Sequence, residues 1–452
     1  MRILIIGGGN IGYTLAESLS AENHDVTVID NDAEVLQTIT ENLDVMLVKG
    51  SGSSLSTLKQ AGAEHAGVVI AVTKSDEINM LCCVMARKLG TKRTAARIRD
   101  PDNVRDGEEI KRQLNIDFVI NPERGTAGEI LRLLRFPAAV EIDTFYRGRV
   151  ELIGFRVTQG DRITGLSVSD IRNKLKAQVL FCIIERDGEV HVPHSSFVIN
   201  DADLVYAAGK YTDITKFFRS IGRARGMAEK VMILGGGRTT HYLAMLAISI
   251  GIKPVVIEPS EKLCARLAQD IPQVTVINGD GTDQDLLESE NIRNMDAFVS
   301  LSESDEENMI ISLFAKQCGV PKVVAKSENS NYVSLVNSLG VESIISPTLI
   351  TSGHILHFVR GLSSSRGGAV ISLSRLLEGR VEALEFVISE KLRHPGEKIK
   401  DLPIKRGVVI AVISRGGKSI IPEDDDVLME GDDVVVVTRL TGFSELNDIF
   451  ER

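Results

Sequence analysis

The 452-residue sequence lacks tryptophan, and its aromatic residues amount to only 4% of the chain. Hydrophobic residues nevertheless make up 43%, which is ordinary for a soluble globular protein. The scarcity of aromatic residues fits an α/β protein with cores of Val, Ile, Leu and Ala. Cysteine is also scarce: the five cysteines are odd in number and include no CxxC pair. This pattern argues against a disulfide framework and predicts reduced core residues.

Long hydrophobic runs are missing as well. No apolar run approaches the roughly 18 residues that a membrane helix needs. The short apolar run at residues 3–6 leads into a glycine loop without a cleavage-like site, so it does not have the form of a signal peptide. Together with the cysteines, these absences predict a cytoplasmic protein.

An excess of positive charge and a recognisable catalytic apparatus are both absent. The chain has 52 basic and 62 acidic residues, a net charge of −10, which argues against a nucleic-acid partner. It contains no nucleophile elbow, Walker lysine motif or paired catalytic carboxylates. Two HxxH motifs, at 191–194 and 354–357, have no nearby third ligand. We therefore predict neither an enzyme nor a metal site.

A glycine-rich nucleotide-binding motif is present twice. Gly7-Gly8-Gly9-Asn10-Ile11-Gly12 follows an apolar strand, and Asp30 ends the next strand. Gly235-Gly236-Gly237-Arg238-Thr239-Thr240 follows a second apolar strand, and Glu258 ends the strand after it. Each acid stands 23 residues beyond its first glycine (30 − 7 and 258 − 235). The repeated spacing indicates duplication of a whole unit.

The duplication extends along the chain. Residues 76–79 match 305–308 at an offset of 229, and residues 148–151 match 379–382 at an offset of 231. We therefore predict four domains in an ABAB order, with residues 223–230 as the linker between the copies. Their boundaries are 1–135, 140–222, 229–360 and 370–452.

The two larger domains are predicted to be Rossmann-like, doubly wound parallel sheets, because strands alternate with helices. The expected strands of the first copy are 2–6, 25–29, 44–48, 67–72, 94–98 and 116–120, with helices at 11–22, 32–42, 53–61 and 77–89. The smaller domains are predicted to be α+β modules. In the first, residues 151–157 are part of a β-rich pattern. A helix is expected next at 167–175, and two strands are expected at 178–185 and 203–208. Helices at 123–135 and about 347–359 are surplus to the sheets, and the first must dock on its own sheet or on a neighbouring domain.

The first glycine loop has the chemistry of a dinucleotide site. A loop between a strand and a helix presents free backbone N–H groups at the positive end of the helix dipole, where a phosphate is stabilised. Gly7 permits the tight turn, Gly9 lets the backbone approach the phosphates, and Gly12 allows close packing of helix on strand. Asp30 is placed to accept hydrogen bonds from a ribose and disfavours a 2′-phosphate. NAD(H) is therefore expected rather than NADP(H).

The second loop departs from this pattern. Thr240 replaces the third glycine and should push the helix away from the strand. Arg238 stands where the first copy has Asn10, and it adds a cation close to the expected phosphates. We interpret this as a nucleotide site with an altered preference for ATP or ADP; a degenerate and empty site is the alternative.

Further ligand contacts are expected at the carboxyl ends of the strands. Thr73 and Lys74 follow the fourth strand, with Ser302 and Glu303 as counterparts. Gly50-Ser51 and Gly279-Asp280 follow the third strands and are placed to contact base or ribose. Arg97 ends the fifth strand, with Lys326 as its counterpart, and is placed to reach the phosphates; the alternative for Arg97 is a surface ion pair with Asp100 or Glu108.

With these residues placed, the chain resembles a known family. Residues 7–12, 28–30, 71–73, 76–79 and 96–99 are similar to the KTN/RCK nucleotide-binding domain, and residues 140–222 and 370–452 resemble the C-terminal RCK domain. The resemblance covers essentially the whole chain. It implies a ligand set of Gly7, Gly8, Gly9, Asn10, Ile11, Asp30, Thr73, Lys74 and Arg97, and in the second copy Gly235, Gly236, Gly237, Arg238, Thr239, Glu258 and Asp280. Ser51 departs from the Asp that is common in the family.

The resemblance also implies a function. Two such pairs in one chain are similar to the regulatory subunits of bacterial potassium-uptake systems. Such proteins form homotetramers of eight α/β units, bind NAD(H) and adenine nucleotides, and assemble as a peripheral ring on the cytoplasmic face of a membrane potassium transporter of the TrkH or TrkG type. A soluble NAD-dependent oxidoreductase and a purely structural scaffold are the alternatives.

Overall fold

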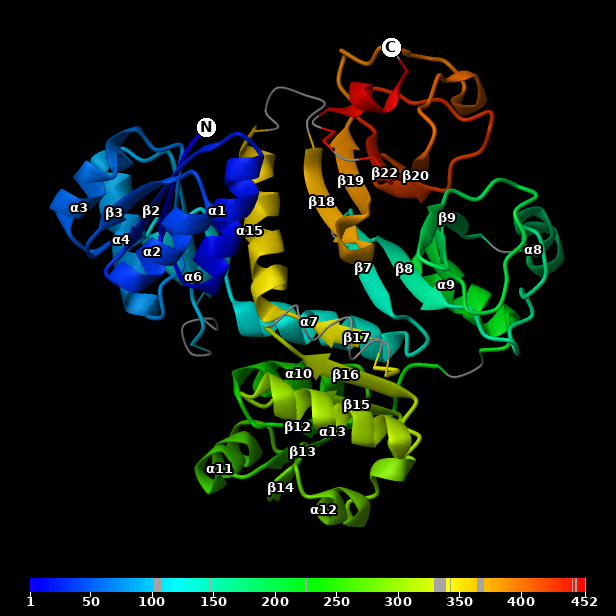
Figure 1. Ribbon diagram of the computed structural model, residues 1–452, viewed down its shortest axis with the longest axis horizontal. Coiled ribbons are helices and arrows are strands. Elements are labelled where there is room, and N and C mark those ends of the chain that lie inside the picture. Colours follow the sequence, from blue (N-terminus) through cyan, green and yellow to red (C-terminus); the bar gives the residue numbers. More distant parts are fainter. Residues whose placement is uncertain are drawn as a thin grey trace.

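The computed structural model describes residues 1–100, 107–146, 148–176, 178–223, 226–328, 339–341, 343–363, 370–440, 442–443 and 445–451. Four sheets follow one another along the chain, alternately parallel and antiparallel (Figure 1). Ala224 and Arg225 of the predicted linker lie outside the described residues. Within the described ranges, no helix is both long and apolar enough to span a bilayer.

The first parallel sheet has the strand order β3-β2-β1-β4-β5-β6. Its register places Ile3 of β1 beside Val26 of β2 and Val68 of β4. Strands β2 and β3 therefore lie on one side of β1, and β4 to β6 lie on the other. This topology confirms the predicted Rossmann-like fold. Its elements are β1 (Arg2–Ile6), α1 (Asn10–Ala21), β2 (Asp25–Asp30), α2 (Ala33–Asn42), β3 (Met46–Lys49), α3 (Leu55–Gln60), β4 (Val68–Ala71), α4 (Asp76–Leu89), β5 (Arg93–Arg97), α6 (Gly107–Gln113) and β6 (Phe118–Ile120).

The second parallel sheet repeats this order as β14-β13-β12-β15-β16-β17. The central strands of both sheets are buried on both faces, as their continuous apolar runs predict. The elements of the second copy are β12 (Lys230–Leu234), α10 (Arg238–Ser249), β13 (Lys253–Glu258), α11 (Glu261–Asp270), β14 (Thr275–Asn278), α12 (Gln284–Ser289), β15 (Ala297–Ser300), α13 (Asp305–Gln317), β16 (Lys322–Lys326) and β17 (Ser343–Ile345).

The two small modules are antiparallel sheets, ordered β10-β9-β11-β8-β7 and β18-β19-β22-β20-β21. The first module contains two elements that were not predicted, β10 and α9. A hairpin at Asp187 and Gly188, both with positive φ, produces the short strand β10, and α9 buries Ile214, Phe217 and Phe218. The elements are β7 (Glu141–Phe145), β8 (Val150–Arg156), α8 (Val168–Leu175), β9 (Leu180–Arg186), β10 (Glu189–His191), β11 (Leu204–Gly209), α9 (Tyr211–Ser220), β18 (Val370–Leu376), β19 (Val381–Val387), β20 (Val408–Arg415), β21 (Lys418–Ile420) and β22 (Asp433–Thr438).

The two surplus helices are exchanged between the copies. Helix α7 (Pro122–Arg135) packs against α10 of the second sheet, and α15 (Pro347–Ser363) packs against α1 of the first (Figure 1). Phe358 of α15 stacks on Phe118 of β6, with ring centroids 4.8 Å apart. Ile355 and Val359 are fully buried in the core of the first domain. Each large domain is therefore completed by a helix from the other copy, and the neighbouring domain is the docking target.

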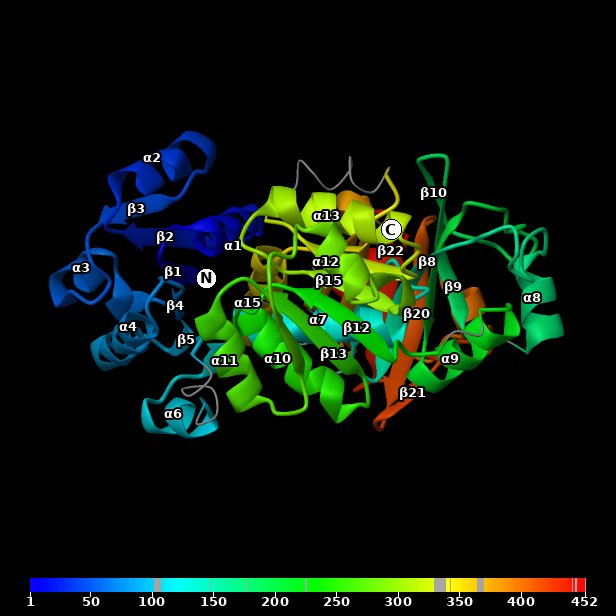
Figure 2. The same ribbon diagram turned by 90° about the horizontal axis from the view of Figure 1, so that it is seen from below.

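The two small modules form one packed unit. Phe145 and Leu152 of the first module share an apolar cluster with Val435 of the second. Two arginines make reciprocal contacts: Arg149 Nη1 donates to the carbonyl of Gly417 (2.9 Å), and Arg380 Nη1 donates to the carbonyl of Gly188 (2.7 Å). Since these residues are equivalent in the two copies, the modules face each other across a pseudo-twofold axis. Seen from below, both antiparallel sheets lie on the same side of the molecule (Figure 2).

Candidate functional site

A cavity of about 1250 Å³ lies between the two parallel sheets, and both glycine loops line it. It therefore belongs to neither copy alone. Of the predicted site residues, those lining the cavity are Gly7, Gly9, Asn10, Ile11, Asp30, Gly50, Ser51, Thr73, Lys74, Arg97, Gly236, Gly237, Arg238, Thr239, Glu303 and Lys326. Gly8, Gly235, Glu258, Asp280 and Ser302 do not line it.

The glycines of the first loop differ in what surrounds them. Gly7 has a φ of +102°, and a Cβ there would lie 3.0 Å from the amide nitrogen of Thr73. A Cβ on Gly12 would lie 1.8 Å from the carbonyl oxygen of Gly7. A Cβ on Gly9 would have no neighbour within 4 Å. Gly7 and Gly12 are thus required by the fold, whereas the space at Gly9 is open toward the cavity.

The helix that follows this loop presents an uncapped N-terminus. Gly9 is the N-cap of α1, with no side-chain cap and no acidic residue in the first turn. Helix α10 of the second copy begins in the same way at Gly237. Free N–H groups at a helix start favour an anion, since they carry the positive end of the helix dipole.

The acids at the ends of β2 and β13 hold their glycine loops. Asp30 accepts hydrogen bonds from the N–H groups of Gly8 (2.6 Å) and Asp32 (2.9 Å). Glu258 accepts equivalent bonds from Gly236 (2.6 Å) and Ser260 (2.8 Å). Asp30 is half-buried and lines the cavity, whereas the longer Glu258 is buried and does not. The two acids share a structural role but differ in access to a ligand.

The second loop accommodates Thr240 with its hydroxyl paired to the backbone of the same loop. Thr240 is fully buried, and its hydroxyl donates to the carbonyl oxygen of Gly235. The equivalent oxygen in the first copy, on Gly7, leaves no room for a Cβ at Gly12. The start of α10 therefore holds a buried, hydrogen-bonded hydroxyl at the position where α1 requires glycine.

Two site-building residues were missed by the sequence analysis, Asp76 and Asn79. The buried amide of Asn79 donates to the carbonyls of Thr73 (3.1 Å) and Arg97 (2.9 Å) and accepts from the Thr73 N–H (2.8 Å). Asp76 accepts from the N–H groups of Arg99 and Asp100. These bonds fix the ends of β4 and β5 at the cavity.

The second copy is built in the same way. The side-chain amide of Asn308 donates hydrogen bonds to the carbonyls of Ser302 and Lys326. The carboxylate of Asp305 accepts a hydrogen bond from the N–H of Glu328. The repetition of residues 76–79 at 305–308 was the signal that would have identified them.

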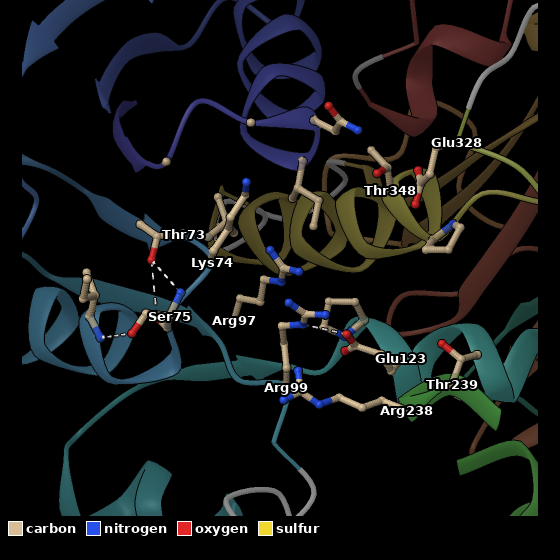
Figure 3. Close-up of a pocket in the computed structure, with 18 of the residues that line it drawn as sticks. Thr73, Lys74, Ser75, Arg97, Arg99, Glu123, Arg238, Thr239, Glu328 and Thr348 are labelled. Carbon is tan, nitrogen blue, oxygen red and sulfur yellow. Dashed lines mark hydrogen bonds and ion pairs between the residues drawn. The ribbon is translucent and has the colours of Figure 1, made fainter. Parts of the chain in front are cut away.

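Three arginines gather on one wall of the cavity (Figure 3). Arg99 Nε donates to Glu123 at 2.6 Å. Arg238, from the second copy, reaches across to within 4.0 Å of the Asp100 carboxylate of the first. The half-buried Arg97 has a buried Nε with no hydrogen-bond partner among the described residues. Burial and the nearby charges of Arg99 and Arg238 lower the pKa of Arg97.

This arrangement bears on two predictions. Arg238 was expected beside the phosphates of its own loop, and it also lies close to β5 of the other copy. The surface ion pair suggested for Arg97 does not engage its Nε, and the side chain of Glu108 lies outside the described residues. A guanidinium held partly buried without a partner at Nε favours an anionic ligand.

Asp280 is exposed, and its carboxylate accepts from the N–H and hydroxyl of Thr282, which lower its pKa. Among the described residues, no three His, Cys, Asp or Glu side chains are grouped so as to hold a metal ion. All five cysteines are buried and free.

Comparisons with known proteins match the whole chain. The TrkA-N domain model matches residues 3–122 and 231–347, and the TrkA-C domain model matches residues 384–451. The chain is 31% identical over its full length to the full-length Trk system potassium uptake protein TrkA homolog 1 of Methanosarcina mazei. It is 32% identical to Trk system potassium uptake protein TrkA of Haemophilus influenzae, over 96% of this chain and 95% of that one. The solved structure of the GsuK channel bound to NAD is similar in fold, with a TM-score of 0.63 and 19% identity over 97% of this chain and 76% of that chain.

Proposed function

The chain belongs to the TrkA family of Trk-system potassium uptake proteins, and from this premise we propose that it is a regulatory subunit that binds NAD(H) and ATP or ADP and thereby gates a membrane potassium transporter. The family is one of transport-system proteins rather than of enzymes. One observation carries the proposal: the two glycine loops, from two copies of the same domain, open into a single cavity.

The first copy supplies the groups that NAD(H) needs. The uncapped start of α1 and the open space at Gly9 suit the pyrophosphate. Asp30 lines the cavity at the end of β2, where the hydroxyls of an adenosine ribose are bound in such folds. Ser51 also lines the cavity, although its hydroxyl is bonded to that of Ser53.

The second copy supplies the charge that a polyphosphate needs. Arg97, at the end of β5, and Arg238, at the start of α10, line the same wall of the cavity, and a third phosphate of ATP is stabilised where two guanidinium groups converge. Because Glu258 is buried and outside the cavity, a ribose at the second loop would have weaker support than at the first. We propose that ATP and ADP are distinguished mainly by contacts that join the two copies.

The exchanged helices α7 and α15 connect this cavity to the small modules. A nucleotide that binds one arrangement of the two large domains better than another shifts the population toward it, by no more than the difference in affinity. Helix α7 leads into β7 and α15 leads toward β18, so a change at the cavity reaches both small modules. We propose that a homotetramer, peripheral on the cytoplasmic face of the membrane, passes this change to a TrkH- or TrkG-type partner.

Two matched substitutions test the nucleotide sites, Gly9→Val and Gly237→Val. At both positions an added Cβ would have no neighbour within 4 Å, and the backbone is extended with negative φ. We expect a loss of stability of no more than about 1 kcal/mol for a poorer N-cap. We also expect Gly9→Val to abolish NADH binding measured by calorimetry, because the side chain fills the phosphate position.

Comparison of the two variants with NADH, ATP and ADP assigns each nucleotide to a loop. Potassium flux into vesicles that contain a TrkH-type transporter, with the parent protein or either variant added, then tests gating. Binding of all three nucleotides to the double variant with unchanged affinity would contradict the proposed sites. Nucleotide binding without any effect on flux would contradict the proposed gating.

A further inference from the structure

The short segment that joins helix α7 to strand β7 is held by side chains from a distant part of the chain. Residues 136–140 lead from α7 into the first small module. The carbonyl oxygen of Ala139 accepts a hydrogen bond from Lys322 Nζ, and that of Val140 accepts one from Ser343 Oγ at 2.9 Å. The same hydroxyl also accepts a bond from Lys322 Nζ, at 2.7 Å. Two side chains of the second large domain therefore hold the entrance to the first small module.

Lys322 is buried at this contact although it carries a charge. It is only 5% exposed, and both Ser343 and Ala139 are buried beside it. Burial of an ammonium group is unfavourable unless hydrogen-bond acceptors replace the lost water. A hydrogen bond from a charged donor is also roughly twice as strong as one between neutral groups. The attachment of Lys322 to the segment is therefore strong, and breaking it without a replacement partner is costly.

Lys322 and Ser343 begin two strands whose other ends reach the cavity. Lys322 is the first residue of β16, and the last residue, Lys326, lines the cavity. Ser343 is the first residue of β17, and Pro347 and Thr348 follow this strand at the cavity wall (Figure 3). Strand β16 spans roughly 13 Å, at ~3.3 Å for each of its four steps (326 − 322). Because it is paired with β15 and β17, it moves with its sheet as one body.

The equivalent residue of the first copy is engaged differently. Arg93 lies beside Val68 at the start of β5, as Lys322 lies beside Ala297 at the start of β16. Arg93 is exposed and donates to the carboxylate of Asp117, in its own domain, at 2.7 Å. Among the described residues, the two copies therefore differ at this position, and the attachment to a small module belongs to the second copy.

We propose that Lys322 is a positioning residue that couples the second large domain to the first small module. The displacement comes from nucleotide binding in the shared cavity, so this inference rests on the proposed function. A nucleotide that favours one arrangement of the large domains moves β16 relative to α7. The ammonium group then carries the backbone of residues 139–140, and with it the start of β7. The first small module therefore responds to the large domain of the other copy.

Hydrogen exchange of the full-length protein, measured by mass spectrometry with and without ATP, ADP or NADH, tests this coupling. Strand β7 is an edge strand paired only with β8, so its exchange depends on the segment that precedes it. In the parent protein, we expect a bound nucleotide to change the exchange rate of β7 by about fivefold or more, and in Lys322→Met by less than about twofold. Nucleotide affinity measured by calorimetry should change by less than tenfold, or about 1.4 kcal/mol, because Lys322 does not line the cavity.

Two further variants accompany this substitution. Ser343→Ala removes the bond to Val140 but leaves the bond from Lys322 to Ala139, so the β7 response should be intermediate. Lys253→Met is the matched control, since Lys253 is exposed and begins β13 at the same end of the same sheet. It should leave the β7 response unchanged.

The outcomes separate this inference from the proposed function. A full β7 response in Lys322→Met, or none in a parent protein that binds nucleotide, would overturn the coupling and leave nucleotide binding intact. A tenfold loss of affinity in Lys322→Met would overturn it too, because Lys322 would then support the cavity itself. If Lys322→Met does not fold, an undiminished response in Ser343→Ala would overturn the coupling. Failure of the parent protein to bind ATP, ADP and NADH would instead overturn the proposed function.

Discussion

The different packing of the two glycine loops gives a quantitative prediction for Gly12→Ala. A Cβ at Gly12 would lie 1.8 Å from the carbonyl oxygen of Gly7, where real contacts are essentially never under 3.0 Å. The added carbon has no rotamer that relieves this overlap, so α1 must move by at least 1.2 Å (3.0 − 1.8). Leu15 and Leu19 of α1 are fully buried and must move with it.

The expected cost follows from this displacement. Overpacking of a core costs about 1–3 kcal/mol, and the gaps opened beneath Leu15 and Leu19 add to it. We therefore expect Gly12→Ala to lower the free energy of unfolding by about 3 kcal/mol or more and to weaken NADH binding. The reverse change, Thr240→Gly, removes one buried hydrogen bond and one buried methyl group, at about 1 kcal/mol each. Glycine in the helix should cost a further ~0.3 kcal/mol.

Urea denaturation followed by far-ultraviolet circular dichroism is the suitable assay, because the chain has no tryptophan. Gly9→Ala is the control, since its Cβ meets nothing within 4 Å and should change stability by less than about 1 kcal/mol. If Gly12→Ala unfolds within about 0.5 kcal/mol of the parent protein and binds NADH equally well, the steric reasoning is refuted.

Two further predictions concern buried charge. Burial raises the pKa of Glu151 to about 7, against the opposing effect of Arg135 and Arg132, so the folded protein holds a proton that the unfolded chain releases near its ordinary pKa of 4.5. Stability should therefore fall as pH rises from about 5 to 7, and Glu151→Gln should be about 1–3 kcal/mol more stable than the parent at pH 8 but equal at pH 5 in urea denaturation. Arg360→Met removes the ion pair that joins α15 to Glu22 of the first domain and should cost about 2–4 kcal/mol, with faster hydrogen exchange in α1. The control is Arg172→Met: both partners of its ion pair with Glu423 are exposed, so it should cost less than about 1 kcal/mol.

The two parallel sheets were predictable because their signals are local. Continuous apolar runs such as Val68–Ala71 identify central strands, and the repeated glycine loops fix the point at which each sheet begins. The family resemblance, which the comparisons confirm over residues 3–122 and 231–347, was specific because the two units stand in tandem. The strand β10 was missed because a three-residue strand produces little alternation. The helix α9 was missed although its sequence carries the signal, since Ile214, Phe217 and Phe218 recur at helical spacings of three and four.

The shared cavity was not predictable, because it depends on how the copies are placed. The apolar stripe of α7 at Ala127 and Ile130 shows that one face is buried, but it contains no information about the partner. For the same reason, the sequence placed Arg238 beside its own loop and could not show its approach to Asp100. Asn79 was overlooked because its amide serves the backbone of two strands that are separated in sequence.

The exchange of helices has a consequence during synthesis on the ribosome. The first domain needs Ile355 and Val359 of α15 to close its core, yet its own last strand ends at Ile120. The 235 residues from Ile120 to Ile355 (355 − 120) must be added in between, which takes about 12–47 s at ~5–20 residues per second. During this time an apolar face of the nascent domain stays open to water. Nascent chains of this protein should therefore be clients of a ribosome-associated chaperone until α15 emerges from the exit tunnel.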